Sequence, residues 1–156
     1  MSAIGTPRVV HASRRIEASA AVIFELIADP ARQPSWDGND NLAHAAGGQR
    51  VRGVGDVFTM TLTRGSIRHN HVVEFIEERL IAWRPSEPDA EPPGHVWRWE
   101  LTPLADRATL VTHTYDWTDL TDPGRLERAR WTTSDRLSAS LARLAEIAER
   151  DVHECL

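Results

Sequence analysis

The pattern that most constrains the fold is an alternation of apolar and polar side chains with a period of two, repeated in successive segments of the middle of the chain. This period is typical of β-strands that bury one face. Short breaks such as Gly65-Ser66 and Asp106-Arg107 separate neighbouring segments. The sequence therefore predicts an antiparallel meander, with strands at 57–64, 67–75, 80–84, 96–102 and 108–117.

The chain on either side of the meander has different patterns. Val9–Ala18 predicts a first strand, and Ser19 can cap a short helix over Ala20–Ala28 that ends at Asp29-Pro30. A second helical turn is expected in Pro30–Leu42. From Asp122-Pro123 onward, apolar residues recur every three or four positions, which predicts one helix of about 40 Å over 124–150. The expected fold class is α+β, with a curved antiparallel sheet wrapped around this helix.

One face of such a sheet must be covered, and the C-terminal helix is the apolar stripe available to cover it. Since a twisted sheet curves away from a straight helix, a pocket is expected between them. The alternation also names its lining, although a slip of one residue would invert a strand's faces. The predicted ligand-binding residues are Phe58, Met60, Leu62, Arg64, His69, His71, Val73, Phe75, Trp97, Trp99, Val111, His113, Tyr115 and Trp117.

Several short motifs add a resemblance to this element order. They are Ala28-Asp29-Pro30, Trp36-Asp37, Gly53-Val54-Gly55-Asp56, Val73-Glu74-Phe75, Leu80-Ile81-Ala82-Trp83 and the segment 112–117. With them, the chain from Val9 to Glu149 resembles the polyketide cyclase/dehydrase and lipid-transport family of the START-like (SRPBCC) superfamily. That resemblance implies the helix-grip fold, with two short helices after the first strand.

The leading functional hypothesis is the binding of a small hydrophobic ligand in this pocket, namely a lipid, a polyketide or another aromatic or isoprenoid-like molecule. The resemblance also implies an alternative, a polyketide aromatase/cyclase. Its candidate catalytic residues are His71, His113, Tyr115 and Arg64, because imidazoles can exchange protons and Arg or Tyr can stabilise an enolate. A third alternative is a protein-interaction module of the chaperone-activator type.

Three imidazoles could in principle meet around a metal ion, since His69 and His71 share one side of a strand and His113 is expected to face inward. The spacing fixes only two of them and no carboxylate completes the set, so neither a metal nor another cofactor is expected. The bland alternative is that these histidines are polar groups satisfied inside an apolar cavity.

Tryptophan and the loops supply further candidates. Trp83 joins Trp97, Trp99 and Trp117 as a residue that could stack on a planar ligand or simply fill the core. Trp36 and Trp131 are candidates for the mouth of the pocket. The polar run 37–41 predicts either a solvated turn or a lid over the entrance.

Composition limits the remaining function classes. The net charge is −5 and all 18 basic residues are Arg, scattered along the chain, which argues against a nucleic-acid partner. A single Cys excludes an internal disulfide. Neither a membrane-spanning segment nor an export signal within Met1–Arg15 is expected. We expect one domain over 1–156 with a short tail at 151–156 that need not be ordered, no membrane anchor, a cytoplasmic location, and a monomer or homodimer.

Overall fold

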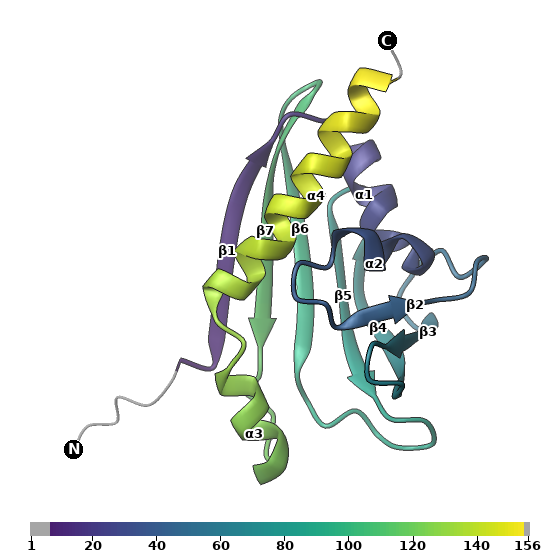
Figure 1. Ribbon diagram of the computed structural model, residues 1–156, viewed down its shortest axis with the longest axis vertical. Coiled ribbons are helices and arrows are strands. Elements are labelled where there is room, and N and C mark those ends of the chain that lie inside the picture. The colour runs from purple at the N-terminus through teal and green to yellow at the C-terminus, as the bar shows by residue number, and fades with distance from the viewer. Residues whose placement is uncertain (1–6, 155–156) are drawn as a thin grey trace.

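A single antiparallel sheet of seven strands dominates the computed structural model, which describes residues 7–154 (Figure 1). Its order is β1-β7-β6-β5-β4-β3-β2, so β2 to β7 follow the chain and β1 joins at the β7 edge. The strands are β1 (Val9–Ile16), β2 (Leu42–His44), β3 (Val57–Leu62), β4 (Ile67–Ile76), β5 (Leu80–Ser86), β6 (Val96–Ala105) and β7 (Ala108–Asp116). The meander is confirmed, and β2 is a strand that the alternation did not predict.

The short helices that follow β1 begin and end where the local sequence predicts. In α1 (Ala20–Ala28), the Ser19 hydroxyl accepts a hydrogen bond from the backbone N–H of Val22 at 3.2 Å. A 3₁₀ turn, η1 (Pro30–Arg32), leads into α2 (Gln33–Trp36). These helices close one side of the sheet's concave face (Figure 1).

The C-terminal region forms two helices, so the prediction of one unbroken helix is wrong. Asp122 caps α3 (Pro123–Arg130) by accepting a hydrogen bond from the Gly124 N–H at 3.0 Å. Trp131 and Thr132 then make tight i to i−3 backbone hydrogen bonds that end α3, and α4 (Ser134–Glu154) begins in a new direction. Helix α4 includes positions 151–154 of the predicted tail, and 155–156 lie outside the described residues.

Helix α4 lies across the concave face of the sheet while α3 sits beyond its end, in the arrangement called a helix-grip fold (Figure 1). Apolar residues of α4, α1 and the sheet share one core, which includes Phe24, Trp99, Val111, Leu141 and Leu144. A second cluster lies between the sheet and α3, with Tyr115, Trp117, Leu120, Ala129 and Leu137.

The register of β4 is displaced by one residue from the prediction. Asn70 pairs with Phe58 and is 5% exposed, so it faces the core side, whereas His71 pairs with Val57 on the opposite face. A β-bulge between Val72 and Glu74 explains the error, because the extra residue shifts the alternation within the strand. Phe75 therefore does face inward, where its ring contacts Phe24 edge-on at 5.6 Å.

Candidate functional site

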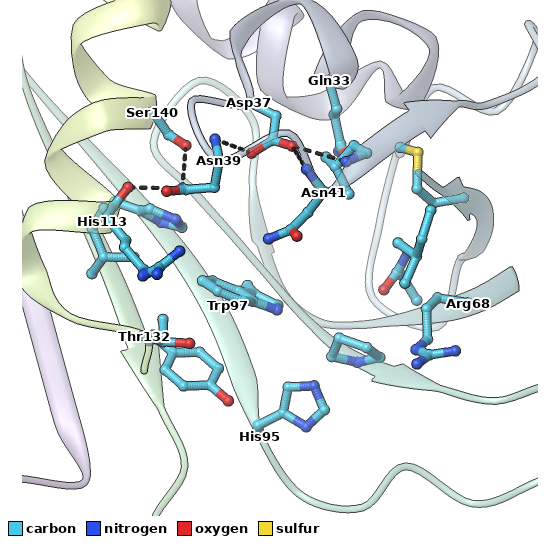
Figure 2. Close-up of a pocket in the computed structure, with 18 of the residues that line it drawn as sticks. Gln33, Asp37, Asn39, Asn41, Arg68, His95, Trp97, His113, Thr132 and Ser140 are labelled. Carbon is cyan, nitrogen blue, oxygen red and sulfur yellow. Dashed lines mark hydrogen bonds between the residues drawn. The ribbon is translucent and has the colours of Figure 1, made fainter. Parts of the chain in front are cut away.

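A cavity of about 460 Å³ lies between the sheet and the segments that cover it, namely α2, the α2–β2 connection, the end of α3 and the start of α4. Residues of both hydrophobic clusters line it, including Trp36 and Trp99 from one and Tyr115 and Leu137 from the other. Figure 2 shows Asp37, Asn39 and Ser140 on one side of this space and Trp97 and His95 on the other. Its volume is within the usual range for small-molecule sites.

A continuous series of rings lines the cavity, from β6 and β7, from His95 just before β6 and from Trp36 at the end of α2; we call it the aromatic row. Trp97 lies 4.3 Å from Tyr115 between ring centroids, and the His113 ring stacks on Trp99 at 3.6 Å. In-register pairing of β6 and β7 places these residues side by side, with Trp97 opposite Tyr115 and Trp99 opposite His113. All members line the cavity: His95, Tyr115, Trp97, His113, Trp99 and Trp36.

His113 is a neutral member of this row. It is 5% exposed, and burial lowers the pKa of its imidazole from 6.5 to about 3. Its Nδ1 lies 3.1 Å from the backbone oxygen of Arg98. Because a carbonyl oxygen can only accept, Nδ1 carries the proton and Nε2 keeps a lone pair. The ring therefore packs as an uncharged aromatic group with one fixed tautomer.

His95 begins the row and was missed by the sequence reasoning. Burial lowers the pKa of His95 from 6.5 to about 4, and the positive charges of Arg125 and Arg68 add to the effect. Its Nδ1 is buried and has no hydrogen-bond partner among the described residues. Burial also raises the pKa of the neighbouring Tyr115 to about 12, so the phenol keeps its proton at neutral pH. Continuing the β6 alternation one step back from Trp97 would have identified His95.

The α2–β2 connection forms an ordered polar wall. The Asp37 carboxylate accepts hydrogen bonds from the backbone N–H groups of Asn39, Asn41 and Leu42 at 3.1, 2.6 and 2.8 Å. Gly38 donates its N–H to the Ser140 hydroxyl on α4 at 3.1 Å, and the Asn39 side-chain amide lies 3.5 Å from the same hydroxyl (Figure 2). The segment is thus docked on α4 and is not a freely solvated turn. Trp131 also lines the cavity and is 65% exposed.

The predicted lining residues fall into three groups. Seven line the cavity: Met60, Leu62, Arg64, Trp97, Trp99, His113 and Tyr115. Four are buried or partly buried in the clusters outside the cavity lining: Phe58, Phe75, Val111 and Trp117. His69, His71 and Val73 were placed on the wrong face of β4, for the reason given above.

These positions also rule out the three-imidazole hypothesis. His71 hydrogen-bonds to the Ser86 hydroxyl at 3.0 Å on the far side of the sheet from His113. Among the side chains of residues 7–150, no three His, Cys, Asp or Glu gather closely enough to hold a metal ion.

Two groups of cavity residues could not be assigned from the alternation. The first comes from β4 and its neighbours, where the register prediction failed or was not made: Thr63, Arg68, Asn70 and Pro85. The second comes from helices, connections and the first residue of the short strand β2, where no period of two was seen: Gln33, Asp37, Asn39, Asn41, Leu42, Arg128, Thr132, Arg136, Leu137 and Ser140. Trp36, Trp83 and Trp131, which were candidates on composition and position, also line the cavity.

Comparison with known proteins supports the fold and the family. Residues 7–149 match the family model described as polyketide cyclase / dehydrase and lipid transport. Two uncharacterized proteins from strains of Mycobacterium tuberculosis are 30% identical over 113 residues, which is 71% of this chain and 48% of each relative. The chain therefore spans about half the length of these curated relatives.

Solved structures of the same fold are more distant in sequence. The Aha1 dimer from Colwellia psychrerythraea superposes with a TM-score of 0.61 at 17% identity, covering 90% of this chain and 96% of that one. Norcoclaurine synthase from Thalictrum flavum, in complex with dopamine and hydroxybenzaldehyde, gives a TM-score of 0.59 at 16% identity, with coverages of 91% and 86%. At these identities the likeness concerns the fold alone. In the described residues, no helix is long and apolar enough to cross a membrane.

Proposed function

The chain belongs to the polyketide cyclase/dehydrase and lipid transport family, and from that premise we propose that it binds a small, largely apolar, ring-containing molecule in the cavity over the aromatic row. The observation that carries the proposal is the aromatic row itself, whose six rings line a cavity of about 460 Å³. Flat rings stack favourably on flat rings in addition to the area they bury.

The expected affinity follows from the area available. A two-ring guest the size of an indole side chain buries about 150–250 Å². At about 25 cal/mol per Å², this burial contributes about 4–6 kcal/mol, before the cost of immobilising the guest is subtracted. Since about 4–6 kcal/mol corresponds to dissociation constants of about 1 mM to about 40 μM before that cost, a minimal neutral probe should bind with a dissociation constant of about 0.1 mM or weaker. A natural ligand that fills the cavity should bind more tightly.

Polar groups in the cavity would orient such a guest. The Trp99 Nε1 and the His95 Nδ1 are buried without hydrogen-bond partners among the described residues. Asn70 faces the cavity with its side chain amide on the sheet side. Since unpaired buried polar atoms cost free energy, a ligand that carries complementary groups would gain by meeting them.

An acid–base enzyme has weaker support. General catalysis is most effective when the pKa of the acid or base is close to the working pH. Burial lowers the pKa of His113 to about 3 and raises that of Tyr115 to about 12, so neither group changes its charge readily near neutrality. These directions suit groups that hold a ligand by packing and hydrogen bonding. A chaperone-activator role rests only on the shared fold.

Isothermal titration with neutral 2-naphthol tests the proposal, using two variants of the same strand. Leu62 lines the cavity at the end of β3, whereas Val57 lies on the opposite face and is half-exposed. Leu62→Trp should fill part of the cavity and reduce the affinity at least tenfold. Val57→Trp should leave it unchanged, and both variants should stay folded by circular dichroism. An absence of saturable binding to the wild type, or an equal loss in both variants, would overturn the proposal.

A further inference from the structure

The cavity carries a strong positive charge at its rim, in contrast to the chain as a whole. Four of its lining residues are arginines, which we call the arginine rim: Arg64, Arg68, Arg128 and Arg136. Among the lining residues the acidic side chain is Asp37, whose two carboxylate oxygens already accept backbone hydrogen bonds. The full chain, by comparison, has a net charge of −5.

These arginines form no ion pair with a carboxylate in the part of the chain whose side chains the structure describes. Other arginines around the sheet do have such partners, as Arg50 has in Glu25 and Glu77, and Arg98 in Glu74. Within residues 7–150, no carboxylate oxygen comes within 4.0 Å of a side-chain nitrogen of the arginine rim. The neighbouring Arg125 does not belong to the rim, and it pairs with Glu87 at 3.5 Å.

Members of the rim come from separate elements that the fold brings together. Arg64 lies in the β3–β4 turn, Arg68 on β4, Arg128 on α3 and Arg136 in the first turn of α4. They are close enough to affect one another, since burial and the charge of Arg64 both lower the pKa of Arg68 and that of Arg128. Like charges repel, and the charge of Glu87 offsets this repulsion only in part, so an anion bound among the four guanidinium groups would relieve it.

We propose that the guest of this cavity is an anionic amphiphile, whose rings lie on the aromatic row and whose carboxylate or phosphate group is held by the arginine rim. Guanidinium groups suit both anions, because their planar N–H donors match two oxygens at once. This inference rests on the proposed function and narrows it, since it excludes uncharged hydrocarbons, neutral phenols and amines as the preferred ligands.

The test compares probes with one ring system and different polar groups. Naphthalene-2-carboxylate should bind at least about tenfold more tightly than naphthalene-2-carboxamide, because hydrogen bonds to charged groups are stronger than those to neutral groups. Raising NaCl from about 0.1 M to about 1 M shortens the Debye length from about 10 Å to about 3 Å. It should therefore reduce the affinity for the carboxylate and leave the affinity for the amide unchanged. 2-Naphthyl phosphate then shows which anion the rim prefers.

Single substitutions locate the effect. Arg68→Gln should reduce the affinity for the carboxylate about tenfold and that for the amide less than twofold. Arg128→Gln, on the exposed face of α3, should reduce the two affinities in the same way. It replaces Arg68→Gln as the test if loss of the half-buried Arg68 prevents folding. The matched control is Arg107→Gln, an exposed arginine in the β6–β7 turn that does not line the cavity.

The outcomes separate this inference from the proposed function. Equal affinities for acid and amide would overturn the anionic guest and leave the binding cavity standing. The same conclusion would follow if Arg107→Gln reduced the affinity for the carboxylate as much as the rim variants do. Binding of neither probe would remove the proposed function and this inference with it.

Discussion

Mild acid should destabilise the protein through His113, and the size of the effect follows from the burial of that ring. The pKa of His113 is lowered from 6.5 to about 3 by burial, so the folded state favours the neutral imidazole. The stabilisation that comes from this neutral form is fully present above pH 6.5 and is lost as the pH falls toward about 3. Each pH unit within this window costs about 1.4 kcal/mol. At about pH 5 the loss through His113 alone is therefore about 2 kcal/mol.

The measurement is the free energy of unfolding in urea at about pH 8 and about pH 5, followed by tryptophan fluorescence. His113→Asn removes the titrating group and keeps an N–H that can reach the Arg98 carbonyl. Its loss of stability between the two pH values should be smaller than that of the wild type by about 2 kcal/mol. Val111→Ala is the control, because it lowers stability on the same strand without removing a titrating group. An unchanged pH dependence in His113→Asn would refute the buried neutral imidazole.

Two further substitutions test the wall and the register. Gly38→Ala should destabilise the protein by about 1–3 kcal/mol in urea unfolding, because a Cβ there would lie 2.5 Å from the backbone carbon of Ala139 on α4. Gly47→Ala is the control and should have little effect, since a Cβ at that position meets no atom within 4 Å. In isothermal titration, Asn70→Leu should change the dissociation constant of 2-naphthol about two- to tenfold, whereas His71→Leu on the far face should leave it unchanged. A larger effect of His71→Leu than of Asn70→Leu would contradict the observed register of β4.

The sequence predicted the parts of the fold that depend on local periodicity and punctuation. The strands of the meander, the Ser19 cap and the end of α1 at Asp29-Pro30 all follow from short-range rules. The alternation also placed Trp97, Trp99, His113 and Tyr115 on the concave face, because β6 and β7 pair without a bulge over this stretch. Family resemblance added the helix-grip arrangement.

What escaped prediction depends on irregularities and on contacts between distant segments. The bulge after Val72 places His69 and His71 on the face opposite to the one predicted from the alternation, and no residue type in that stretch indicates a bulge. The break between α3 and α4 places Arg128 and Arg136 at the cavity, which an unbroken helix would not suggest. The docking of Gly38 on Ser140 joins positions about a hundred residues apart, beyond the reach of any local pattern.

The most direct test of a guest on the aromatic row is a titration of the uniformly ¹⁵N-labelled protein with 2-naphthol, observed at the indole N–H signals of the six tryptophans. Trp97 and Trp99 line the cavity, whereas Trp117 is buried in the second cluster outside it. We expect the signals of Trp97 and Trp99 to shift saturably while that of Trp117 stays in place. Shifts confined to Trp117, or none at any concentration up to the solubility limit, would contradict the binding of an aromatic guest at this site.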